Sequence, residues 1–187
     1  GNTEAVKTLL KNDAQKTINE IANNGMTALI AACYIDDDEE NIKDVTKINS
    51  IVKILLEYNV DEVDAIDNNG LTALKYAAFN GAVEAVKLLI KQGAKVDAIN
   101  HFSNTALIYA SENGHKEVVK LLIEQGANVD ETDKEKGFTA LMWASRNDDK
   151  EAVKLLLEKG AEVDAASHAQ QQPLRRRGGF VRLQRKG

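Results

Sequence analysis

The sequence predicts an all-α repeat solenoid, in which helix–turn–helix units with short β-turn fingers stack side by side. A Thr-Ala-Leu motif recurs at intervals of 45, 33 and 34 residues, beginning at Thr27, Thr72, Thr105 and Thr139. A Val-Lys pair recurs at intervals of 46, 34, 33 and 34 residues, beginning at Val6, Val52, Val86, Val119 and Val153. Because two separate markers keep one period, the chain is a repeat architecture of about four and a half units.

The first helix of a unit is predicted to begin after the threonine of the motif. The hydroxyl of Thr72 is a suitable N-cap, because it can accept a hydrogen bond from an unpaired N–H of the first turn. Leu74, Ala77 and Ala78 follow at the spacing of one apolar helix face. Gly81 then breaks this helix.

The second helix carries its apolar face on Val86, Leu89 and Ile90. It is expected to end at a residue that tolerates the left-handed conformation. Glycine or asparagine fills that place in every unit, at Asn12, Asn59, Gly93, Gly126 and Gly160. An extended piece and an Asp-x-x-Gly turn, such as 67–70, then form the finger. One helix pair cannot bury both of its apolar faces alone, so stacking is expected to supply most of the stability.

The second unit contains an insertion at about residues 34–47. Thr27 and Val52 are separated by 25 residues, against 14 for Thr72 and Val86, so 11 are extra. The insertion is acidic, and the pattern favours a solvated loop followed by a lengthened second helix. A calcium loop is disfavoured, because the turn glycine and terminal glutamate of an EF-hand are missing.

These boundaries divide the chain into a repeat domain, 1–165, and a basic tail, 166–187. The units are expected at about 1–21, 22–66, 67–99, 100–132 and 133–165.

Composition is that of an ordinary globular protein, with 43% apolar and 28% charged residues among 187. Cys33 is the only cysteine, which excludes an intramolecular disulfide and a cysteine-based zinc site. No apolar window is long enough to span a membrane. We expect an intracellular, cytoplasmic protein that is a monomer or weak oligomer. The missing initiator methionine indicates a piece of a longer chain.

Charge is divided unevenly along the chain. The tail carries basic residues and no acids, whereas residues 1–165 hold 18 basic and 29 acidic side chains, a net charge of −11. The basic residues of the tail are Arg175, Arg176, Arg177, Arg182, Arg185 and Lys186. An acidic body argues against nucleic-acid binding by the repeat domain and favours basic partners.

The repeat resembles the ankyrin family over residues 1 to about 165. The segments DNNGLTALKYAAFNGAVEAVKLLIKQGAKVDA (67–98) and NGHKEVVKLLIEQGANVD (113–130) carry the resemblance almost position by position. The chain departs from the family pattern where Ala replaces the proline after the threonine. Ile30, Lys75, Ile108 and Met142 replace the family's histidine, which implies loss of a hydrogen bond that braces the fingers. Ser103 and Asp148 replace glycines.

The resemblance implies a non-enzymatic scaffold that binds a protein or peptide on the concave surface of fingers and first helices. It implies no cofactor and no metal. The implied contact residues are Tyr34, Asn68, Asn69, Leu71, Phe79, Asn80, His101, Phe102, Asn104, Glu112, Asn113, Phe138 and Arg146.

The aromatic residues of this set have two interpretations. Phe79 and Phe102 are either binding anchors or side chains that pack on the neighbouring finger. His115 is interpreted as a structural residue and Cys33 as a core residue. Trp143 and Tyr109 share one register position, and packing between repeats explains them best.

A rival hypothesis places nucleic-acid or phosphate binding in the basic tail, because clustered arginines bind RNA. The tail is otherwise a non-native extension or a segment docked on an acidic surface. An enzymatic role would need residues that this chain lacks.

Overall fold

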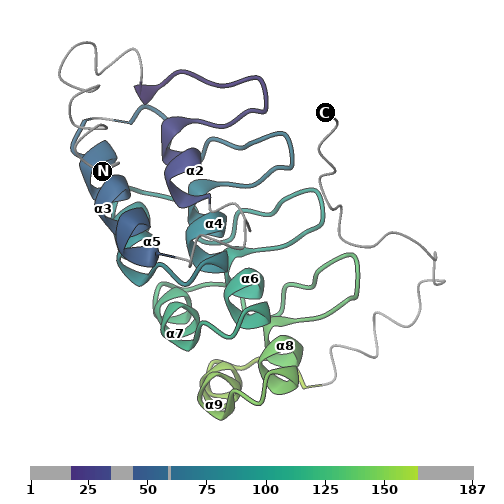
Figure 1. The fold of residues 1–187 in the computed structure, drawn as a ribbon. Coiled ribbons are helices and arrows are strands. Elements are labelled where there is room, and N and C mark those ends of the chain that lie inside the picture. Colours follow the sequence, from purple (N-terminus) through teal and green to yellow (C-terminus); the bar gives the residue numbers. More distant parts are fainter. Residues whose placement is uncertain (1–17, 35–43, 59, 164–187) are drawn as a thin grey trace.

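The computed structural model describes residues 18–34, 44–58 and 60–163, and it confirms the stack of helix pairs. The first helices of the pairs are α2 (Ala28–Cys33), α4 (Ala73–Phe79), α6 (Ala106–Glu112) and α8 (Ala140–Arg146). The second helices are α3 (Val45–Leu56), α5 (Val83–Lys91), α7 (Lys116–Glu124) and α9 (Lys150–Glu158). Figure 1 shows these two sets as two columns, with the fingers extending to one side of the first column.

Several predictions concern segments outside the described residues. They are the second helix of the first unit, most of the acidic insertion, and the tail with Arg175, Arg176, Arg177, Arg182 and Arg185.

The predicted threonine caps are confirmed in all four units. Each hydroxyl accepts a hydrogen bond of 3.3 Å from the backbone N–H three residues later. Thr27, Thr72, Thr105 and Thr139 are all buried. The cap therefore fixes where the first helix begins and how the finger enters it.

The second helix of the unit with the insertion is longer than its counterparts, as predicted. α3 has 12 residues, whereas α5, α7 and α9 have 9 each. The carboxylate of Asp44 caps α3 by accepting from the backbone N–H of Thr46.

The backbone keeps the left-handed conformation at the two positions where Ser103 and Asp148 replace a glycine of the repeat pattern. Ser103 has φ of 61° and Asp148 has φ of 54°. Gly81 has φ of 72°, and a Cβ built on it would lie 2.6 Å from Nδ1 of His115. Gly81 is thus required both by its conformation and by the close approach of the next unit.

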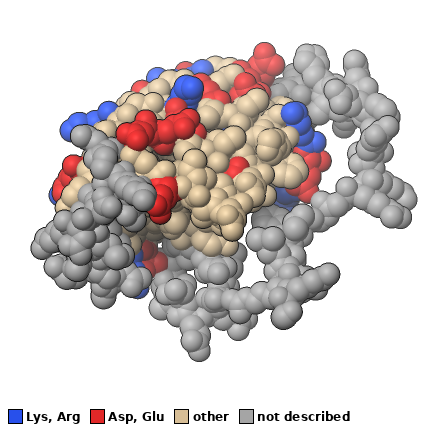
Figure 2. All heavy atoms as spheres, turned by 90° about the horizontal axis from the view of Figure 1, so that it is seen from above, with Lys and Arg blue, Asp and Glu red and all other residues tan. Residues whose placement is uncertain are grey.

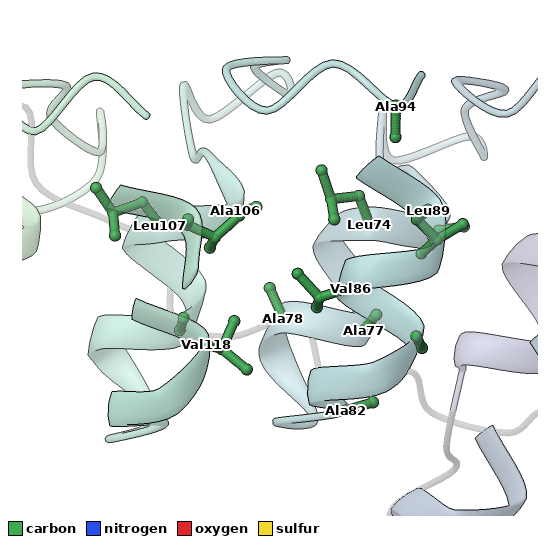
Figure 3. Close-up of a cluster of buried hydrophobic side chains, with 14 of the residues drawn as sticks. Leu74, Ala77, Ala78, Ala82, Val86, Leu89, Ala94, Ala106, Leu107 and Val118 are labelled. Carbon is green, nitrogen blue, oxygen red and sulfur yellow. The ribbon is translucent and has the colours of Figure 1, made fainter. Parts of the chain in front are cut away.

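Small side chains allow the helix pairs to pack closely. Every unit has alanine five residues after the capping threonine, and in the last three units this residue is buried. These alanines are Ala77, Ala110 and Ala144. Figure 3 shows Leu74 and Ala78 of α4 next to Ala106 and Leu107 of α6, with Val86 of α5 and Val118 of α7 beside them. The seam between units is therefore a continuous apolar core.

A ladder of side-chain to backbone hydrogen bonds joins the loops of successive units. In each bond a carboxylate or amide oxygen accepts from an N–H of the next unit, at 2.8 to 3.2 Å. The acceptors are Asn19, Asp64, Asp97 and Asp130, and the donors are Asp61, Lys95, Asn128 and Glu162. This ladder gives the recurring Val-Asp of the repeat a structural role.

At one of the four positions where the family has histidine, the side chain makes a hydrogen bond within its own finger. Lys75 is 1% exposed, and its ammonium donates to the carbonyl of Gly70 at 3.1 Å. A long cationic side chain thus braces the finger of its own unit. Burial lowers the pKa of Lys75 to about 8, although the negative charges of Asp67 and Asp64 oppose this shift.

Replacement of Lys75 tests this buried cation. Isoleucine occupies the equivalent position at Ile30 and Ile108, so Lys75→Ile is compatible with the fold. The pKa of Lys75 is about 8 in the folded protein and 10.5 in the unfolded chain, so between these values the folded protein has released the Lys75 proton and the unfolded chain still holds it. The stability of the wild-type protein therefore rises with pH in this range, because the cost of burying the charge disappears. Lys75→Ile is expected to stabilise the protein by about 1 kcal/mol or more at pH 7.5.

The measurement is urea unfolding of both proteins between pH 7.5 and 10. The stability advantage of Lys75→Ile should shrink as pH rises through this window. A constant difference between the two proteins would contradict the depressed pKa.

Candidate functional site

The candidate site is the surface formed by the fingers and the first helices, which lie next to each other along the stack (Figure 1). Backbone bonds join neighbouring fingers: the N–H of Asn68 donates to the carbonyl of Asn24 at 3.0 Å, and that of Lys134 to the carbonyl of Phe102 at 2.9 Å. An antiparallel bridge pairs Thr132 with Thr139 within the last finger. The fingers are therefore fixed in register rather than independent loops.

Each finger is also held by an aromatic residue of the first helix in its own unit. The hydroxyl of Tyr76 donates to Oδ2 of Asp67 at 2.8 Å, and Nε1 of Trp143 donates to Oδ2 of Asp133 at 3.3 Å. In the unit between them, the hydroxyl of Tyr109 accepts from the amide of Asn100 at 2.9 Å. Tyr76 and Tyr109 pack on aromatic rings of the preceding unit, whereas Trp143 packs on Phe138 of its own unit. All three residues also brace the fingers, which the sequence interpretation missed.

Burial raises the pKa of the Tyr76 hydroxyl, and its hydrogen bond to Asp67 and the charge of Asp67 add to this shift. Burial likewise raises the pKa of Tyr109. Both tyrosines therefore stay neutral, and Tyr76 keeps the proton that it donates.

Three of the predicted aromatic contacts pack edge-to-face on these bracing residues. Ring centroids lie 5.5 Å apart for Tyr34 and Tyr76, 6.0 Å for Phe79 and Tyr109, and 5.1 Å for Phe138 and Trp143. Phe79 and Phe138 are consequently half-buried. Phe79 therefore packs on helix α6 of the next unit and not on a finger.

Phe102 and Tyr34 differ from the other predicted aromatics because more of their surface is exposed. Phe102 is 53% exposed and Tyr34 is 36% exposed. The backbone N–H of Phe102 donates to Oδ1 of Asn100 in the same turn, and its carbonyl accepts from the N–H of Lys134 in the next finger. Phe102 is the aromatic side chain on this surface that is best placed to contact a partner.

The predicted role of Asn80 as a partner contact needs correction. Asn80 is 4% exposed, and its amide donates to the carbonyls of Cys33 and Tyr76, each at 3.0 Å. His115 and Asn147 make the same kind of bond to the preceding unit, with Nε2 of His115 lying 2.9 Å from the carbonyl of Phe79. Asn80 thus belongs to the framework between units, and the structural interpretation of His115 agrees with the contact.

The remaining predicted contacts lie at the turns and helix ends. Asn68, Asn69 and His101 are exposed at the finger tips, whereas Leu71 and Asn104 are half-buried. Asn113 donates to the carbonyl of Tyr109 within its own helix. In the last two units the ammonium of Lys136 lies 3.4 Å from Glu112 and 4.1 Å from the centre of the Trp143 ring, and the Arg146 guanidinium lies 5.5 Å from that ring.

A row of exposed isoleucines was missed by the sequence interpretation. Ile21 is 67% exposed, Ile66 is 55% exposed and Ile99 is 56% exposed. They occupy one register position, just before the first residue of the finger turn, and Thr132 occupies it in the fourth unit. The sequence does carry a signal for them, because isoleucine recurs once per repeat just before the turn, where an exposed loop usually has a polar residue.

Other kinds of site find no support in the described part of the chain. Within it, no three His, Cys, Asp or Glu side chains come close enough to hold a metal ion. Cys33 is fully buried, and burial raises the pKa of its thiol, so it is not an activated nucleophile. None of the helices described is long and apolar enough to cross a membrane.

Comparison with protein families identifies the repeat. The family model for ankyrin repeats (3 copies) matches residues 1–100 and 92–167. The chain therefore belongs to the ankyrin repeat family, whose members generally mediate protein–protein interactions and are typically non-enzymatic scaffolds. A search of curated proteins found no significant match.

The bridging role of Asn80 gives a direct prediction. Asn80→Ala would leave the buried carbonyl of Cys33 without its partner and should cost about 1–3 kcal/mol of unfolding free energy. Asn113→Ala is the matched control, because it occupies the same register position and bonds only within its helix. Urea unfolding of both variants tests the assignment, and equal losses would count against it.

Proposed function

We propose that this chain is a recognition module that binds a protein or peptide segment across its fingers and first helices. The observation that carries the proposal is Phe102, a large aromatic side chain that is exposed although its own backbone N–H and carbonyl are both hydrogen-bonded. A rigid aromatic on an exposed surface is a typical binding anchor. Because the finger is already ordered, a partner that covers this ring binds with little loss of conformational entropy.

Polar groups around Phe102 would give the contact its orientation. Asn68 and Asn69 lie on the preceding finger, and His101 precedes Phe102 in the same turn; all three are exposed. Amide groups both donate and accept, so they suit the backbone of a bound peptide. Tyr34 adds a second partly exposed ring at the C-terminal end of α2.

The experiment is a selection of random displayed peptides against the purified chain, followed by fluorescence anisotropy with the peptides recovered. Phe102→Ser should weaken their binding about tenfold or more, the loss of one well-buried anchor. Phe79 and Phe138 are poorer test positions, because they pack on Tyr109 and Trp143 and their loss would also affect stability.

Lys87→Ala is the control, because Lys87 is exposed on α5 in the second column of helices. It should leave binding unchanged, and both variants should unfold at nearly the wild-type urea concentration. Selected peptides that bind Phe102→Ser as tightly as wild type, or no selected peptides at all, would overturn the proposed function.

A further inference from the structure

The isoleucine row runs across consecutive fingers. Ile21, Ile66 and Ile99 belong to three successive units, and each is more than half exposed. Ala65 and Asp67 are buried on the two sides of Ile66, and Asn100 is buried next to Ile99, whereas Glu20 and Ala22 on the two sides of Ile21 are exposed. At Ile66 the pattern is that of an extended segment, in which successive side chains point to opposite sides.

Three exposed aliphatic side chains in one register position lower the solubility of the protein. Among the described residues, none of the three belongs to the apolar core or packs against it. The fourth unit has Thr132 at this place, so the fold does not require isoleucine there. A partner that covered the row would remove three exposed apolar side chains from water, and exposed apolar surface of this kind often marks an interaction site.

The charges beside the row define the partner further. Four acidic side chains that are exposed or half-buried lie within four residues of an isoleucine of the row. They are Glu20, Glu62, Asp64 and Asp97. Lys95 is the lone lysine or arginine in those stretches, which lie in the described part of the chain except for Thr17. Figure 2, which views the stack from above, shows acidic and basic side chains interspersed around a broad uncharged area. The row therefore attracts cations and repels acidic segments.

The spacing of the row also limits the partner. Neighbouring packed helices lie about 8–10 Å apart, and the fingers follow the helices because Asn68 N bonds directly to the carbonyl of Asn24. An extended chain in the polyproline II conformation has three residues per turn and rises about 3.1 Å per residue, so every third side chain faces the same side and advances by about 9 Å. Such a segment with apolar side chains three residues apart would place one on each isoleucine and leave two positions between them for lysine or arginine.

We propose that the isoleucine row docks an extended cationic segment that has an aliphatic side chain at every third residue. This inference deepens the proposed function and rests on it, because it names the chemistry of the partner on the same fingers.

The probe is a fluorescein-labelled synthetic peptide in which Lys-Lys-Leu is repeated three times. The control peptide has the same composition, with its three leucines adjacent. Anisotropy titrations at about 0.1 M salt should show tighter binding of the spaced peptide, with affinity falling as salt is raised because the pairing is partly ionic.

The variant is the triple substitution Ile21→Thr, Ile66→Thr and Ile99→Thr, which copies the residue found at Thr132. It should weaken the spaced peptide about tenfold and leave the control peptide nearly unchanged. Because the three side chains are exposed, urea unfolding of the variant should match wild type.

Equal binding of the two peptides, or unchanged binding of the spaced peptide to the triple variant, would overturn the inference. The proposed function would still stand if the displayed peptides depend on Phe102. Selected peptides that lack lysine and arginine and bind the triple variant as tightly as wild type would also overturn it. Failure of the proposed function has a different signature, the absence of any peptide that depends on Phe102.

Discussion

Close contact between successive first helices is the constraint on which the structure depends. Ala77, Ala110 and Ala144 are at most 1% exposed, and they have no side chain beyond Cβ. A larger residue would hold the helices apart, because cores of this density tolerate extra volume poorly. The distance between helix pairs in turn sets the distance between fingers. A recognition surface built from fingers is therefore determined by the smallest residues of the core.

Polar bonds between units convert this packing into a fixed register. Asn80, His115 and Asn147 each bond to a carbonyl of the preceding unit, and Asn19, Asp64, Asp97 and Asp130 each accept from the following one. Within a unit, Tyr76 and Trp143 hold the carboxylate at the base of the finger. With the fingers held in this way, Phe102 remains exposed at the tip of its finger, as recognition requires.

Sequence periodicity predicted the fold well because the repeated residues are those that the stack itself needs. The threonine caps, the glycines and the longer α3 all follow from local rules of helix geometry. The surface was harder to predict, because exposure depends on which neighbour covers a side chain. Phe79 and Phe102 look alike in sequence, but Phe79 faces Tyr109 of the next unit, whereas Phe102 has 53% of its surface exposed. Asn80 resembles a loop residue in sequence and is buried only because Cys33 of the preceding unit lies next to it.

Hydrogen exchange of finger amides after a change in the seam tests the central claim most directly. Ala110→Leu should cost about 1–3 kcal/mol by overpacking. The amide of Lys134, which bonds across to the carbonyl of Phe102, should exchange faster in this variant than in wild type. If the variant is destabilised to this extent while the Lys134 amide keeps its full protection, the fingers do not depend on the seam and the account is contradicted.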